Sequence, residues 1–150
     1  MNRETEYFDQ DYQLPSGRAE VLRDGRDAAI ISTGCILDTV MTAAAALETL
    51  GISASVINVP TIKPFDAEAV RDAAQKCRIL CTVEEHNIYG GLGSAVAEVL
   101  AWGGTGAPTE FVGIPDTFTE TGKYTDLLAK YGVDAAGVVR GIERVLARKH

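Results

Sequence analysis

Short apolar runs alternate along the chain with longer amphipathic segments. The runs have the length and composition of β-strands, and they lie at residues 19–23, 27–33, 53–59, 78–83 and 110–114. The first alternates apolar and polar residues, as a half-buried strand does. The second and fourth are almost continuously apolar, which favours strands buried on both faces.

Helical segments lie between and after these strands. Residues 36–50 are rich in Ala and Leu and place their apolar side chains at helical spacing, and Gly51 predicts where this helix ends. Asp66 is a typical N-cap for the next helix, which we expect to reach Lys76. A Gly-rich turn opens a third helix, and two more follow, so the later helices are expected from residues 89–93 to 102, at 123–131 and at 135–148.

Strands that alternate with helices predict βαβ units and a largely parallel sheet of about five strands, covered by helices on both faces. The strand at residues 19–23 joins the next through a short turn, so it should pair antiparallel at an edge of the sheet. Residues 1–17 are acidic and end in Pro-Ser-Gly, which is typical of an arm or linker. Residues 18–150 are therefore expected to form one α/β domain.

The composition argues against several classes of protein: nucleic-acid binding, membrane-spanning and zinc-binding proteins. The 150 residues carry a formal net charge of −7, which argues against nucleic-acid binding. No stretch of eighteen apolar residues exists and the amino terminus lacks the features of a signal peptide, so we expect a cytoplasmic protein without a membrane span. The three cysteines, Cys35, Cys77 and Cys81, lack the spacing of a zinc site. We expect no metal and free, mostly buried thiols.

The segment VEEHNIYGGLGS, residues 83–94, has the highest density of chemical groups. It places two carboxylates and a histidine at the carboxyl end of a predicted strand, where open parallel sheets bind ligands. The Gly-rich helix start offers N–H groups to an anion. The candidate ligand or interface residues are Glu84, Glu85, His86, Gly90, Gly91 and Gly93. Alternatively, the glycines serve close backbone packing and the carboxylates cap the next helix.

Weaker candidates lie at the ends of other strands. Lys63 could reach an anion, and Cys35 stands at a helix start but has no histidine nearby in the sequence to act as base. Residues 116–123 read as turn and cap residues. Trp102 is expected to be a packing anchor or an interface residue. The residues alone predict no catalytic centre.

Four blocks of the sequence resemble the carboxy-terminal domain of transketolase. They are LRDGRDAAIISTG, ALETLGISASVINVPTIKPFD, VEEHNIYGGLGSAVAEVL and VGIPDTFTETGKYTDLLAKYGV. The blocks occur in the order and at the approximate spacing of the family and cover roughly residues 17–148. The EEHN and GKY blocks look closer to split, two-subunit transketolases than to deoxyxylulose-phosphate synthase or the β subunit of 2-oxo acid dehydrogenases. The resemblance implies a three-layer α/β/α sandwich with a mixed five-stranded sheet whose first strand is antiparallel.

The resemblance also implies an activity, its cofactors and partner modules. Transketolases transfer a two-carbon ketol unit between sugar phosphates with thiamine diphosphate and a divalent metal, usually magnesium. Two other modules of the family bind the diphosphate and the pyrimidine ring, and this sequence matches neither. We therefore carry over no catalytic residue and expect the isolated chain to bind no cofactor and to be inactive. The resemblance implies a role in assembly, with the other transketolase subunit or domains as partners and a homodimer of the assembled enzyme.

Two alternatives stay open at this stage. The first is that the chain is the corresponding module of a deoxyxylulose-phosphate synthase or of the β subunit of a 2-oxo acid dehydrogenase, which share this domain. A stand-alone module that binds an anionic effector at the Gly-rich helix start is the other alternative. The sequence does not give the sugar substrate or the oligomeric state of the isolated chain.

Overall fold

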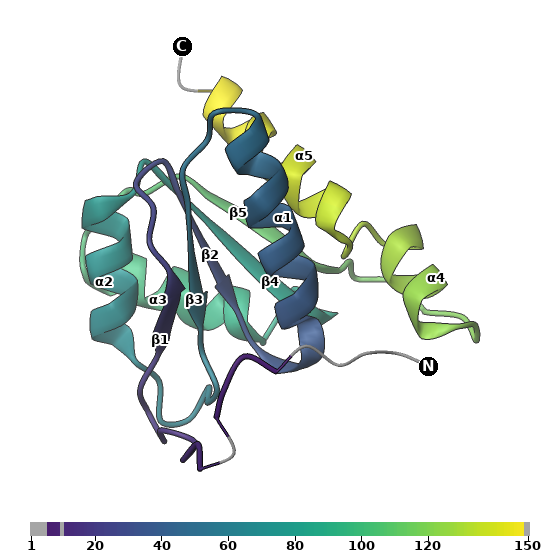
Figure 1. Ribbon diagram of the computed structural model, residues 1–150, viewed down its shortest axis with the longest axis horizontal. Coiled ribbons are helices and arrows are strands. Elements are labelled where there is room, and N and C mark those ends of the chain that lie inside the picture. The colour runs from purple at the N-terminus through teal and green to yellow at the C-terminus, as the bar shows by residue number, and fades with distance from the viewer. Residues whose placement is uncertain (1–5, 10, 149–150) are drawn as a thin grey trace.

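Five strands form a single mixed sheet in the computed structural model, which describes residues 6–9 and 11–148 (Figure 1). The strands are β1 (Glu20–Arg23), β2 (Ala28–Ser32), β3 (Ala54–Asn58), β4 (Ile79–Asn87) and β5 (Thr109–Ile114). Their order across the sheet is β1-β3-β2-β4-β5. The last four run parallel and β1 runs antiparallel to β3, so the predicted mixed α/β fold is confirmed.

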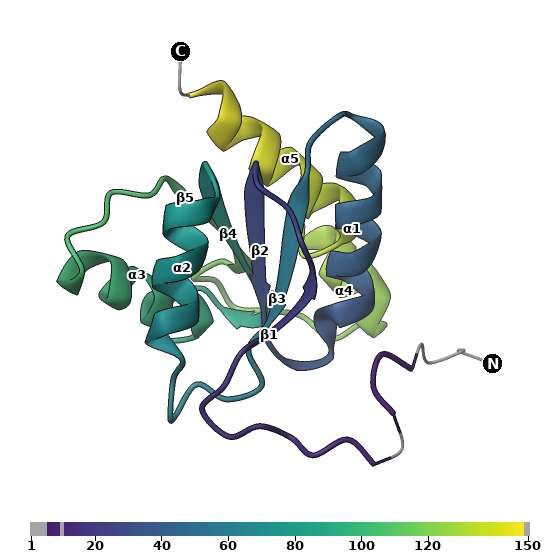
Figure 2. The same cartoon turned by 60° about the vertical axis from the view of Figure 1, so that its left-hand side comes forward.

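Helices cover both faces of this sheet (Figure 2). They are η1 (Gly34–Ile36, a 3₁₀ turn), α1 (Leu37–Thr49), α2 (Ala67–Lys76), α3 (Leu92–Trp102), α4 (Tyr124–Lys130) and α5 (Ala135–Ala147). Helices α1 and α5 pack together on one face, and α2 and α3 pack together on the other. This arrangement confirms the three-layer sandwich.

The strict alternation of strand side chains creates two separate cores. On β2, Ile30 contributes to the core under α1 and α5, whereas Ile31 contributes to the core under α2 and α3. Both side chains are essentially inaccessible to solvent. Because β2 is central and covered on both faces, all five of its residues are buried, as its continuously apolar sequence predicts.

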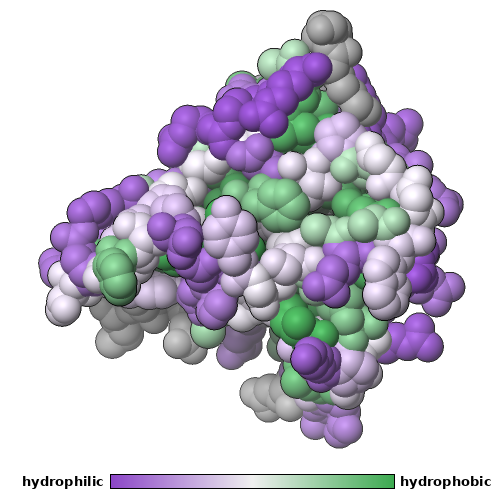
Figure 3. All heavy atoms as spheres, turned by 180° about the vertical axis from the view of Figure 1, so that it is seen from behind, coloured by the Kyte–Doolittle hydropathy of each residue, from purple (hydrophilic) through white to green (hydrophobic). Residues whose placement is uncertain are grey.

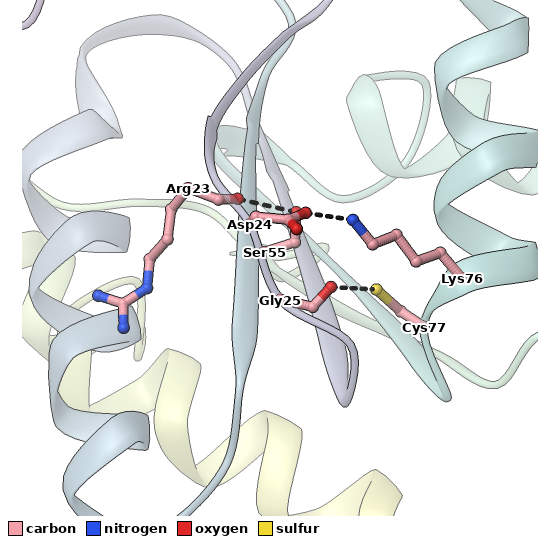
Figure 4. Close-up of polar contacts among 6 residues, drawn as sticks. All are labelled: Arg23, Asp24, Gly25, Ser55, Lys76 and Cys77. Atoms are coloured by element: carbon pink, nitrogen blue, oxygen red, sulfur yellow. Dashed lines mark hydrogen bonds and ion pairs between the residues drawn. The ribbon is translucent and has the colours of Figure 1, made fainter.

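Strand β1 lies at the predicted edge, but its partner is β3 and not the next strand in the sequence. The reason is that β2 already pairs in parallel with β3 on one side and β4 on the other. The segment between β1 and β2 is held by polar contacts (Figure 4). Lys76 pairs with Asp24, and the Cys77 thiol donates to the Gly25 carbonyl at 3.6 Å.

Most predicted element boundaries lie within two residues of the observed ones. Asp66 caps α2 as expected, since its Oδ1 accepts the N–H of Ala69 at 3.1 Å. Gly51 follows the end of α1 with a positive φ of 77°. The exception is β4, which continues four residues beyond the predicted end at Val83 and regains pairing with β5 at Asn87.

The described part of the amino-terminal arm packs against the domain through tyrosines. The hydroxyl of Tyr7 donates to Asp38 at the start of α1 at 2.5 Å. Tyr12 stacks on Phe8 at 4.1 Å and donates to Glu20 at 2.5 Å, and burial together with this carboxylate raises the pKa of Tyr12 to about 12. Residues 1–5 and 10 of the expected arm lie outside the described residues.

Within residues 6–9 and 11–148, none of the helices has the length and apolar character of a membrane span. The same residues contain no group of three His, Cys, Asp or Glu side chains that could hold a metal ion.

Candidate functional site

The carboxylate of Glu84 lies beneath the first turn of α3. Strand alternation turns this side chain toward the α3 face of the sheet, where it is only 2% exposed. Its two oxygens accept the N–H groups of Leu92 and Gly93, each at 2.8 Å. Bonds from backbone N–H groups to a carboxylate are among the stronger hydrogen bonds in proteins. Glu84 therefore satisfies the free donors at the amino end of α3 from inside the fold.

Two of the predicted glycines are required by the close approach of this carboxylate and its neighbours. A Cβ on Gly91 would lie 1.9 Å from Glu84 Oε2. A Cβ on Gly93 would lie 2.6 Å from the ring of Phe111 and 3.2 Å from Thr82 Oγ1. No side chain fits at such distances. Because Gly91 and Gly93 have no side chains, the start of α3 packs directly against β4 and β5.

Glu85 points to the opposite face of the sheet, toward η1 and α4. Its Oε1 accepts the N–H of Cys35 at 3.4 Å, and the hydroxyl of Tyr124 donates to its Oε2. Partial burial, and then the hydrogen bond to Glu85, raise the pKa of Tyr124. We call Cys35, Glu85 and Tyr124 the Glu85 clamp, because one carboxylate joins three segments that are far apart in the sequence.

The two remaining candidate residues, His86 and Gly90, belong neither to the Glu84 contact with α3 nor to the Glu85 clamp. His86 is exposed, and its Nδ1 lies 3.0 Å from the carbonyl oxygen of Asn87. Gly90 is also exposed, has a positive φ of 82°, and donates its N–H to Ser94 Oγ at 2.8 Å. The structure therefore brings Glu84, Gly91 and Gly93 together but separates them from Glu85.

The structure also places the weaker candidates: Lys63, Trp102 and the cysteines. Lys63 and Arg71 line an open groove of about 470 Å³ between the loop before α2 and helix α3. Trp102 borders this groove and is 90% exposed, so it is not a packing anchor of this chain. Cys77 and Cys81 are buried free thiols and Cys35 is exposed. Burial raises the pKa of Cys81, which makes that thiol inert.

Sequence reasoning missed two residues of the β5–α4 loop region. Tyr124 was not expected to meet Glu85, and Phe118 is fully exposed. Beneath this loop lies a pocket of about 220 Å³ that includes Glu85, Ile114 and Tyr124 among its lining residues. A single aromatic residue within the polar run DTFTETGK is the signal that could have identified Phe118.

Comparison with known proteins agrees with this geometry. The sheet order, the antiparallel edge strand and the carboxylate-capped, Gly-rich start of α3 define one α/β sandwich domain. The pattern of the family described as "Transketolase, C-terminal domain" matches residues 17–138. The chain belongs to this family.

A solved structure titled "Split gene transketolase, inactive beta4 tetramer" is similar over 97% of this chain, with a TM-score of 0.90 and 38% sequence identity. The 1-deoxy-D-xylulose-5-phosphate synthase 1 of Geobacter sulfurreducens is 42% identical over 91% of the chain. The 6-deoxy-6-sulfo-D-fructose transketolase subunit SqwH of a Clostridium species is 41% identical over 89%.

The chain spans only part of each of these proteins. It covers 22% of the Geobacter synthase, 41% of the Clostridium subunit and 48% of the split-gene transketolase chain. The larger share of each relative lies outside the module described above.

Proposed function

We propose that the chain is the carboxy-terminal part of a transketolase that transfers a two-carbon ketol unit between sugar phosphates. The observation that carries this proposal is the likeness to the split-gene transketolase, which extends over nearly the whole chain at 38% identity. In this proposal the chain has a structural role in assembly. It contributes no catalytic residue and is inactive alone.

The residues of this chain do not fit the cofactor. The amino end of α3 is the natural position for a diphosphate group, but the N–H groups of Leu92 and Gly93 are already bonded to Glu84. A diphosphate would have to displace a buried carboxylate. We therefore assign thiamine diphosphate and magnesium to the diphosphate- and pyrimidine-binding modules of the assembled enzyme. A homodimer of that assembly and a cytoplasmic location are further parts of the proposal.

A second candidate is the same module of a 1-deoxy-D-xylulose-5-phosphate synthase. It is supported by the synthases of Geobacter sulfurreducens and Pelotomaculum thermopropionicum, which are both 42% identical to the chain. Both activities need the same cofactor modules, so the structural role of this chain is the same in either case.

The test is an assay with thiamine diphosphate, magnesium, xylulose 5-phosphate and ribose 5-phosphate. The chain is measured alone and together with the thiamine-binding subunit from its own organism. We expect ketol transfer only in the mixture. Formation of 1-deoxy-D-xylulose 5-phosphate by the mixture would favour the second candidate. Turnover by the chain alone would overturn the structural role.

A further inference from the structure

The polar loop between β5 and α4 carries one aromatic side chain, Phe118, that is fully exposed. Every residue from 115 to 126 is exposed. Phe118 has no measurable burial, at 104% relative exposure, and Tyr124 is 53% exposed. An aromatic ring in water is unfavourable, and aromatic residues are enriched in the cores of protein interfaces, which have polar rims. Here the rim is provided by Asp116, Glu120 and Lys123.

Two contacts on its α4 side hold this loop in place. Tyr124 is tied to β4 through the Glu85 clamp, and Glu120 pairs with Lys130 of α4. The Phe118 ring is thus presented outward from an anchored loop and does not fold back into the pocket below. Helix α4 and this loop extend beyond the sheet (Figure 1), and the view from behind shows them on the left as a mostly hydrophilic projection with a hydrophobic spot on it (Figure 3).

The position of the arm indicates what covers this loop. The family is described as a carboxy-terminal domain, so other modules precede it in its longer relatives. Tyr7, among the first described residues, contacts Asp38 at the start of α1. The same helix start follows Cys35, which the clamp joins to Tyr124. A module that precedes the arm would therefore approach the domain at the end of the sheet where the β5–α4 loop lies.

We propose that the β5–α4 loop, residues 115–123, docks onto the module that precedes this domain in its relatives, with Phe118 as the anchor. The partner surface is an apolar pocket for one aromatic ring with a polar margin, which is the usual anatomy of an interface hot spot. This inference rests on the proposed function. It adds which surface of the chain makes the assembly contact.

The experiment uses titration calorimetry to measure how tightly the full chain binds the separate subunit of the same organism that carries the preceding, thiamine-binding modules. Phe118→Ala is expected to weaken the affinity at least about tenfold, as truncation of a central aromatic anchor does. Leu50→Ala is the matched control, because Leu50 is 55% exposed but lies at the opposite end of α1. It should change the affinity less than about twofold. Since Phe118 contacts solvent only, its variant should keep the unfolding temperature of the native chain.

The outcomes separate this inference from the proposed function. If the native chain forms no complex, the proposed function fails and the docking surface with it. If the complex forms and Phe118→Ala binds as tightly as the native chain, only the docking surface is overturned. Sedimentation of the isolated chain tests the other occupant: a dimer that Phe118→Ala converts to a monomer would assign the loop to a second copy and overturn the proposal.

Discussion

Single residues decide how β4 meets α3, and Glu84 is the first of them. Its carboxylate accepts two backbone N–H groups at 2.8 Å while almost fully buried. Glu84→Gln keeps the shape of the side chain but turns an NH₂ group toward one of these donors. We expect the free energy of unfolding to fall by about 1–3 kcal/mol, measured by urea titration. The control is Glu98→Gln, the same change at an exposed position of α3, which should alter the free energy of unfolding by less than about 0.5 kcal/mol. Equal losses in both variants would contradict the capping role.

A substitution at Gly91 tests the contact between β4 and the start of α3 through a steric clash. Gly91→Ala places a methyl group where Glu84 Oε2 lies, at 1.9 Å. The backbone or the carboxylate has to move, so we expect a loss of about 1–3 kcal/mol in the free energy of unfolding. In Gly106→Ala the new methyl group meets no atom within 4 Å, and this variant is the control. A Gly91→Ala protein as stable as the control would show that the close approach is unimportant.

At the scale of elements, Asp66 connects α2 to the chain that leads into β1. Its Oδ1 caps α2 through Ala69, and its Oδ2 accepts the N–H of Ala19 at 2.9 Å. Asp66→Ala should therefore destabilise the domain by about 1–2 kcal/mol. Asp66→Asn retains an oxygen acceptor and should lose less. The measurement is urea unfolding at neutral pH. If Asp66→Ala matches the native chain, the cap does not stabilise the domain.

The same carboxylate predicts a pH dependence. Partial burial acts to raise the pKa of Asp66, but the N–H groups of Ala19 and Ala69 outweigh it and hold the pKa below its ordinary value. The ionised form is thus favoured in the folded state. Its contribution is fully present above the unfolded pKa of about 3.9 and is lost as the pH falls through the lowered folded pKa. The stability difference between the native chain and Asp66→Asn should shrink in that range. A constant difference would contradict this assignment.

At the scale of the whole molecule, the sequence predicts the layers and the strands but not the contacts between distant segments. Short runs of apolar or alternating residues, bounded by turn residues, identified all five strands. The extension of β4 from Glu84 to Asn87 was not predicted, since charged residues rarely continue a buried strand. The hydrogen bond from Tyr124 to Glu85 links residues 39 positions apart, and no local pattern encodes such a pair. Alternation along β4 also sends Glu84 and Glu85 to opposite faces, which divides the cluster that the sequence presents as one.

The three thiols report on the packing of the whole molecule. Cys35 is exposed, whereas Cys77 and Cys81 are buried, and burial raises the pKa of both buried thiols. Since the thiolate is the reactive form, a disulfide reagent should modify Cys35 rapidly in the native chain and all three cysteines only in denaturant. Cys35→Ser should lose the rapid phase. A rapid phase that persists in this variant would mean that the buried thiols are accessible.

The rapid phase also monitors the proposed assembly, because the Glu85 clamp places Cys35 near Tyr124 at the docking end of the sheet. A preceding module seated on the β5–α4 loop should shield this thiol. We therefore expect modification of Cys35 to slow at least about tenfold when the thiamine-binding subunit is saturating, in proportion to the bound fraction. Phe118→Ala should restore the rate of the free chain at the same subunit concentration, whereas Leu50→Ala should not. Full reactivity of Cys35 in a saturated complex would place the module on another face of the sandwich.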